Sequence, residues 1–327
     1  MKKNIVVGVF GSMNTDIIAY GVEKFLKAGE QSVGGILKIG PGGKSRNIAQ
    51  MVSVLVGKNK VAMVGKTVKD DFNLWKVPFN AMEREGVITD FIKILNFKKT
   101  GKFPGVAIIP VDKKGKNQIY VLPGINEDFC EEDIDEVEEI FEIIRNNEGV
   151  VSFTLEMPYR TGVHIVNKCK KYGIKVIIDP GGILKKMKWK KLLEGCYFLK
   201  PNEFEAEILT GVKVEDFKTG KIAGKKILDY GVENVLITCG EKGGYFFSKN
   251  ISEYIKIPRI DVESEEKDET GCGDQVTAYI IYGIVSGKGK KETVEEAIVA
   301  GSLQFYKKGI QPVRKSEVKK VIEKVKK

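Results

Sequence analysis

The residues best suited to chemistry lie in a glycine-rich segment, Asp268 to Asp274. Apolar residues follow this segment at helical spacing, at Val276, Tyr279, Ile280 and Ile284, so it is predicted to be a turn that opens a helix. Backbone N–H groups at a helix start lack partners within the helix and lie at the positive end of its dipole, so the turn can bind an anion. Asp274 fits two roles there: a helix cap, or a carboxylate general base beside a bound phosphate.

A second glycine cluster, residues 40–44, comes just before a helix that starts near Asn47. Two glycines before a helix are often only a turn. However, Asn14 and Asp16 follow the first predicted strand, and the loops at the carboxyl ends of strands are where α/β proteins bind ligands. Together these side chains supply the donors and acceptors that a polyhydroxylated sugar requires.

The elements that must position these residues follow from the apolar pattern. Strands are predicted at residues 5–10, 60–64, 150–155, 175–179 and 232–238, and helices at 47–56, 134–144 and 160–171. Alternating strands and helices predict an α/β fold with a doubly wound, mostly parallel sheet. Residues 92–122 read instead as short strands with turns, so the segments at about 14–38 and 92–122 are expected to form a small antiparallel β lid inserted in one domain spanning 1–327.

Composition narrows the class of protein. The 327 residues carry a net charge of +10 from lysines spread along the chain, which favours a solvated surface over a nucleic-acid partner. The five cysteines match no zinc pattern or disulfide framework, which suits a reducing, cytoplasmic location. The apolar run from Ile5 to Phe10 is too short for a signal peptide or a membrane span. A Rossmann dehydrogenase is excluded because no GxGxxG follows the first strand.

Six segments, in order, resemble the ribokinase (PfkB) family of carbohydrate kinases. The first two, Gly11 to Asp16 and Gly42 to Asn47, are similar to its substrate loop and first signature. Leu155 to Pro158 looks like a strand end whose Glu touches the sugar. The remaining segments are similar to the Asn-x-x-Glu motif, the nucleotide loop and the second signature: Asn202 to Glu205, Thr238 to Gly243, and Asp268 to Asp274.

This resemblance implies an ATP-dependent sugar kinase that uses ATP and Mg²⁺. Asp274 would be the general base, and the backbone of Gly271, Cys272 and Gly273 would hold the γ-phosphate. The implied sugar-binding residues are Asn14, Asp16, Gly42, Gly43, Lys44, Asn47 and Glu156. Asn202 would contact ATP, and Glu205 would act on Mg²⁺ through water. The nucleotide loop would contribute Thr238, Gly240, Lys242 and Gly243.

Family members often bind a monovalent cation beside the anion site, and the corresponding positions here are Asp268, Thr270, Lys307 and Gly309. Val313 departs from the pattern because ribokinases tend to carry a hydroxyl residue there. The resemblance is therefore compatible with K⁺ binding and does not require it.

The choice of substrate stays open at this point. Lys44 and Glu156 favour ribose, but nucleoside, hexose and sugar-acid kinases share the same base and anion site. Phe97 and Phe103 could form a slot for a nucleoside base. Arg46 is expected to point to solvent; if it faced the pocket, it would suit an anionic sugar.

Two further hypotheses concern the whole protein. A non-catalytic sugar or nucleotide sensor on the same fold is an alternative, which the presence of Asp274 disfavours. The apolar positions of the lid need cover, because an isolated ribbon is marginal in water. We therefore expect a homodimer that pairs the lids of two chains.

Overall fold

The computed structural model describes residues 4–113, 115–183, 187–258, 260 and 267–325. A large sheet of nine strands forms its centre, in the order β13-β12-β11-β10-β9-β8-β1-β4-β5. The strands from β5 to β11 run parallel, and β12 and β13 add antiparallel pairs at one edge. Their bounds are β1 Val7–Phe10, β4 Val61–Lys69, β5 Ile88–Asn96, β8 Val150–Thr154, β9 Lys175–Asp179, β10 Phe198–Leu199, β11 Asn234–Thr238, β12 Gly244–Ser248 and β13 Ile251–Ile255.

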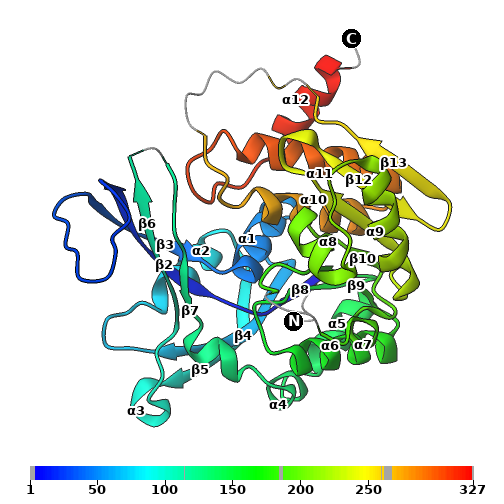
Figure 1. Cartoon of the computed structure of the whole chain (residues 1–327). Coiled ribbons are helices and arrows are strands. Elements are labelled where there is room, and N and C mark those ends of the chain that lie inside the picture. Colours follow the sequence, from blue (N-terminus) through cyan, green and yellow to red (C-terminus); the bar gives the residue numbers. More distant parts are fainter. Residues whose placement is uncertain (1–3, 114, 184–186, 259, 261–266, 326–327) are drawn as a thin grey trace.

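Helices cover both faces of this sheet (Figure 1). One face carries α1 Lys44–Val56, α2 Lys76–Arg84, α10 Cys272–Val285, α11 Lys290–Gln304 and α12 Lys315–Val325. The other carries α4 Glu131–Asp135, α5 Glu139–Asn146, α6 Tyr159–Tyr172, α7 Trp189–Leu193, α8 Glu203–Thr210 and α9 Phe217–Asp229. Successive residues of β9 face opposite clusters: Val176 and Ile178 pack against one and Ile177 against the other. Burial on both faces explains why the central strands read as continuous apolar runs.

A second, smaller sheet projects from one side of the molecule, with α2 beside β2 and β3 (Figure 1). Its strands are β2 Asn14–Val22, β3 Ile36–Gly42, β6 Gly105–Asp112 and β7 Tyr120–Leu122, in the order β3-β2-β6-β7. The predicted doubly wound sheet with a separate lid is thus confirmed. Two of the lid's three pairings are antiparallel, and the central β2–β6 pairing is parallel.

Two expected boundaries differ from the structure. Residues 92–96 belong to β5 at the edge of the large sheet, so the second lid segment begins at Gly105. The helix expected over residues 134–144 is divided into α4 and α5. The short connections α3 Phe97–Thr100 and η1 Gly124–Asp128 link the large sheet with the small one and with α4. No helix among the described residues is long and apolar enough to cross a membrane.

Candidate active site

The predicted anion-binding turn is present at the start of α10. Gly271 caps the helix with φ 77°, a conformation that favours glycine. Asp268 holds the turn in shape, because its carboxylate accepts hydrogen bonds from the N–H groups of Thr270 (2.9 Å) and Gly309 (2.8 Å). Burial opposes ionisation of Asp268, but these hydrogen bonds dominate and lower its pKa. The Cys272 N–H donates to the Glu269 carbonyl (3.3 Å), whereas the N–H groups of Gly273 and Asp274 lie where a helix start leaves donors for an anion.

Asp274 lies in that first turn and is 3% exposed. Its Oδ2 accepts a hydrogen bond from Asn47 Nδ2 (2.7 Å). Its Oδ1 lies 3.7 Å from Lys44 Nζ and has no hydrogen-bond partner among the described residues. A buried carboxylate oxygen without a donor is costly, so this oxygen is suited to a hydroxyl group of a bound molecule.

Lys44 stands next to Asp274 at the start of α1. The negative charge of Asp274 raises the Lys44 pKa, against the opposing effect of burial. Gly181, which follows β9, makes room for the lysine: a Cβ there would lie 2.6 Å from Lys44 Cδ. The lysine is therefore fully charged near neutral pH and is held beside the carboxylate.

In the β2–β3 pairing Asn14 is in register with Gly42 and Asp16 with Gly40, and the Asp16 carboxylate lies diagonally against Gly42. A Cβ on Gly42 would overlap the Asp16 carboxylate, so glycine is required for Asp16 to keep its position. Burial raises the pKa of Asp16 to about 6, while the positive charge of Arg46 acts in the opposite direction.

The sequence predicted that Arg46 points to solvent. This prediction is wrong, because the Arg46 side chain is fully buried. Its guanidinium donates to the carbonyl oxygens of Gly42 (3.2 Å) and Pro41 (2.6 Å). It also contacts Gln50 Oε1 and Asn47 Oδ1. Burial lowers its pKa to about 10. Arg46 therefore fastens the end of β3 to α1, and its hydrogen bonds go to protein groups.

Glu156 follows β8 and joins two loops of the site. Its Oε2 accepts hydrogen bonds from Ser12 Oγ (2.5 Å) and from the backbone N–H of Lys44 (2.9 Å). Burial raises the Glu156 pKa, with the charge of Lys44 opposing. Gly43 completes this junction with φ 88°, close to the backbone of Ser12 and Asn14.

Sequence reasoning missed an ion pair beneath the anion-binding turn. Lys200 Nζ lies 2.8 Å from Asp179 Oδ2 and donates to the Gly273 carbonyl (3.3 Å), and both side chains are buried. Thr277 Oγ1 also donates to Asp179 Oδ2 (2.7 Å). Asp179 ends β9 and Lys200 directly follows β10, so the sequence could place both at the carboxyl edge of the sheet, but it could not show that they pair.

Asn126 is a second residue that the sequence did not indicate. Its Nδ2 donates to Asn14 Oδ1 (2.9 Å), and its side chain also bonds the backbone of Met13 at 3.3 and 3.4 Å. It lies in η1, far from Asn14 in sequence, so only the fold reveals the contact. Asn126 fixes the start of β2, where the chain passes from β1 of the large sheet into the small sheet.

The residues predicted to bind the nucleotide lie at the start of α8, at the end of β11 and in the turn that follows β11. Asn202 and Glu205 make a reciprocal capping box at the start of α8, with distances of 2.8 and 2.9 Å. Thr238 forms a bridge with Asn202 at the end of β11. Gly240 and Lys242 lie in the short helix η2 Gly240–Lys242, and Gly243 follows with φ 99°. Burial raises the Glu205 pKa, as does the nearby charge of Asp179.

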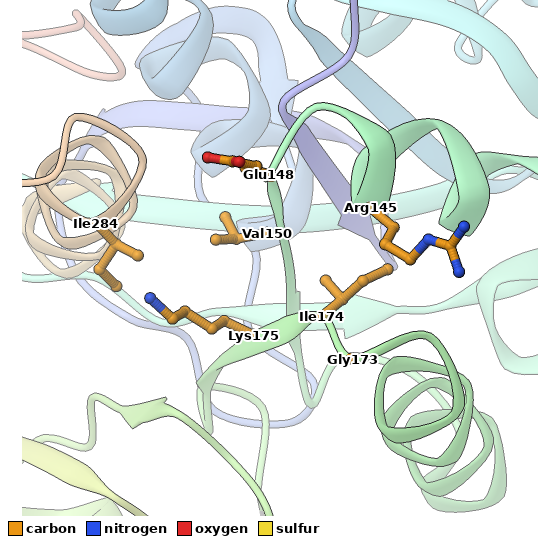
Figure 2. Close-up of a pocket in the computed structure, with 8 residues that line it drawn as sticks. Arg145, Glu148, Val150, Gly173, Ile174, Lys175 and Ile284 are labelled. Atoms are coloured by element: carbon orange, nitrogen blue, oxygen red, sulfur yellow. The ribbon is translucent and has the colours of Figure 1, made fainter.

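A cavity of about 280 Å³ lies at the other end of the large sheet, where β8 and β9 begin. Figure 2 shows Glu148, Lys175 and Ile284 around it. None of the predicted site residues lines this cavity. The predicted site residues lie instead at the carboxyl ends of the strands, where open α/β sheets bind ligands.

The fold and this site together define a phosphotransferase: an anion-binding helix start, a buried carboxylate beside it and a polar set sized for a small hydroxylated molecule. A family model described as pfkB family carbohydrate kinase matches residues 4–316. The chain therefore belongs to the pfkB family of carbohydrate kinases, which confirms the resemblance seen in the sequence. The predicted activity, an ATP-dependent sugar kinase, is confirmed at this level.

Individual members of the family are similar to this chain over nearly its whole length. Ribokinase of Haemophilus influenzae is 30% identical over 95% of this chain and 95% of its own length. Deoxyribokinase of Salmonella typhi is 28% identical over 93% of this chain and 94% of its own length. The structure of Arabidopsis thaliana ribokinase complexed with ribose and ATP is similar with a TM-score of 0.82 at 28% identity, covering 97% of this chain and 98% of that one.

Proposed function

We propose that this protein transfers the γ-phosphate of ATP to a hydroxyl of ribose or a closely related small sugar, with Asp274 as the general base. The supporting observation is the environment of the Asp274 carboxylate. Asn47 orients one oxygen, and the other has no hydrogen-bond partner among the described residues, within the turn that begins α10. A phosphoryl-transfer enzyme needs little more than a placed hydroxyl, its proton acceptor and neutralised charge on the phosphoryl group.

In the proposed reaction, Asp274 Oδ1 takes the proton of the sugar hydroxyl as its oxygen attacks the γ-phosphorus. The bond between the γ-phosphorus and the bridging oxygen breaks, and ADP leaves with that electron pair. Those N–H groups of residues 271–274 that bond no protein carbonyl donate to the phosphoryl oxygens as negative charge develops. Lys44 supplies a positive charge beside the same point.

Polar groups from β2, α1 and the loop after β8 surround the place of the sugar. Asn14, Asp16, Gly43, Lys44 and Glu156 are assigned to its hydroxyls. Ionised carboxylates such as Asp16 accept strong hydrogen bonds from hydroxyl groups. A site built in this way rejects analogues that lack a hydroxyl, because its own buried groups would be left unpaired.

The acidic residues near the nucleotide fit an Mg²⁺ ion held mainly by the phosphates. No cluster of three or more acidic, His or Cys ligands occurs among the described residues. Asp179 is already paired with Lys200, and Glu205 Oε2 accepts from Asn202 N. Mg²⁺ keeps several of its waters in such sites, so Glu205 would contact it through water while the ion neutralises phosphate charge.

Two of the alternative substrates lose support. The rings of Phe97 and Phe103 contact each other with centroids 4.5 Å apart, so no nucleoside base fits between them. Arg46 is engaged by protein groups, so it gives no reason to expect an anionic sugar. Deoxyribose gains support from the Salmonella typhi relative and is the second candidate.

A substrate panel tests this proposal. ATP consumption would be measured with ribose, 2-deoxyribose, fructose, common nucleosides and 2-keto-3-deoxygluconate. We expect turnover with ribose, and much poorer turnover with 2-deoxyribose. Preference for 2-deoxyribose would favour the second candidate, and ribose remaining inert beside a reactive anionic sugar would contradict the ribose assignment.

A homodimer is also proposed, with the small sheet as the contact surface. Its strands expose apolar side chains that a monomer would leave in water: Ile36, Leu37, Ile39, Ile108, Tyr120, Val121 and Leu122. By strand register, Leu37, Ile39, Ile108, Tyr120 and Leu122 share one face of the sheet, and an exposed apolar face of this kind marks an interaction site.

A further inference from the structure

The end of α11 and the turn that follows it pack against the anion-binding turn. Asp268 accepts from Gly309 N, and Asp268 N donates to the Phe305 carbonyl (2.9 Å). The carbonyl oxygens of Thr270 and Gly309 are two of the groups that the family resemblance assigns to a monovalent cation. Whether such an ion fits depends on what already occupies the space between these oxygens.

That space holds the side-chain amide of Gln304, the last residue of α11. Gln304 Nε2 lies 2.7 Å from the Gly309 carbonyl oxygen and 3.2 Å from that of Thr270. The residue is fully buried. An NH₂ group carries two N–H donors, so one amide donates to both carbonyl oxygens and occupies the position between them that a cation would need.

A second difference from the family pattern, Val313, also argues against a bound cation. Val313, where ribokinases tend to carry a hydroxyl residue, is fully buried and brings only hydrocarbon to this region. Its backbone N–H donates to Gln275 Oε1 (2.9 Å). The Lys307 side chain turns away toward α12, where it pairs with Glu317 (2.9 Å). The residues present do not fit a monovalent cation.

We propose that the Gln304 amide takes the place of the monovalent cation in this protein, so that the anion-binding turn is held without potassium. The amide is covalently attached to α11 and cannot dissociate. It holds the Thr270 carbonyl directly before Gly271, whose left-handed conformation begins α10. The shape of the anion site is thereby independent of the ions in solution.

The competing hypothesis is that the Gln304 amide has the opposite orientation, with Oε1 facing the two carbonyl oxygens. Gln304 Oε1 has no partner among the described residues. If the amide were reversed, three oxygen atoms would meet, an arrangement that a bound cation would stabilise. A saturable response of the wild-type protein to K⁺ would therefore overturn the proposal.

The first experiment compares the wild-type protein in KCl and in tetramethylammonium chloride at equal ionic strength, which keeps general screening constant. We expect the melting temperature to coincide in the two salts. Sugar phosphorylation should also differ by less than about twofold, since a ligand that does not bind the native state shifts nothing. The activity measurement rests on the proposed function. The melting temperature does not rest on the proposed function. It therefore tests this inference even if the protein phosphorylates none of the sugars in the panel.

The second experiment changes the amide. Gln304→Ala removes the donor and leaves an oxygen-lined space, so K⁺ should raise the melting temperature of this variant by about 2 °C or more. Gln311→Ala is the matched control, because Gln311 is an exposed glutamine of the same turn. If Gln304→Ala does not fold, Gln304→Glu places a carboxylate oxygen near the same carbonyls and should show the same response. Variants that fold and stay indifferent to K⁺ would contradict the proposal, as would a wild-type response.

Discussion

Two neighbouring cations, Lys44 and Arg46, have different tasks in this site. Lys44 reaches the open side of the site, where it faces the Asp274 carboxylate at 3.7 Å. Arg46 lies behind it, wholly inside the protein, with its donors taken by Pro41, Gly42 and side chains of α1. Its burial lowers its pKa to about 10, so it remains charged and partly offsets the cost of burying Asp16.

The first prediction at the residue scale concerns Asp274. In Asp274→Asn the amide can no longer accept the hydroxyl proton, so kcat should fall by at least about 100-fold, the low end for loss of a general base. ATP affinity and melting temperature should change little. Asp229→Asn, at the exposed end of α9, is the control and should retain full turnover. Near-normal kcat in Asp274→Asn would remove this residue from the mechanism.

The second prediction concerns the pH dependence of stability and follows from Asp16. Burial raises its pKa from 3.8 to about 6 in the folded protein. Between these values the native state keeps a proton that the unfolded state has lost, so the stability that this group contributes falls as pH rises toward 6. Above pH 6 the ionised, buried carboxylate costs the folded state about 3 kcal/mol relative to acid pH.

Asp16→Asn removes that cost because its side chain stays neutral. The variant should be more stable than wild type above about pH 6, and the difference should disappear below about pH 4. Denaturant unfolding at several pH values measures it, with Asp71→Asn, at an exposed position, as the control. A difference that does not vary with pH would show that Asp16 is not buried as described.

At the scale of elements, the site depends on how closely β2, β3 and β6 approach each other. Asn14 of β2 is in register with Gly42 of β3 on one side and with Gly105 of β6 on the other. A Cβ at Gly105 would overlap the side chains of Asn14 and Asn126. Because positions 42 and 105 are both glycine, there is space for the polar side chains of β2.

Gly42→Ala tests this packing. The added methyl group would displace the Asp16 carboxylate, so KM for the sugar should rise at least about tenfold while KM for ATP stays within about twofold. Gly40→Ala is a matched control from the same strand, because a Cβ there meets no atom within 4 Å. Equal effects of the two substitutions would contradict a specific role for Gly42.

The large elements were predictable from the sequence because burial on both faces leaves a clear apolar pattern. β9 has the predicted bounds, and α6 differs from its predicted range by a single residue at each end. β5 was misassigned because an edge strand is half exposed, and its alternation resembles that of an antiparallel ribbon. Pairs such as Asp179–Lys200 and Asn14–Asn126 come from separate elements, and local spacing does not reveal them.

At the scale of the whole molecule, the small sheet presents an apolar surface. We predict a homodimer in solution by light scattering at micromolar concentration. Leu37→Glu, on exposed β3, would bury a charge at that contact and should give a monomer. Ile222→Glu, an equally apolar exposed position on α9, should leave the dimer intact. A wild-type protein that is only monomeric would defeat the prediction.

The position of β1 in the large sheet has a consequence for synthesis of the chain. β1 pairs with β4 on one side and with β8 on the other. Because a chain emerges from the ribosome N-terminal end first, β4 is available early. The other edge of β1 must wait until the whole small sheet and α5 have been made. During that interval an apolar strand edge is open to wrong partners, the situation in which nascent proteins aggregate or need chaperones. The strand that leads into the sugar loop is therefore also a point of vulnerability during translation.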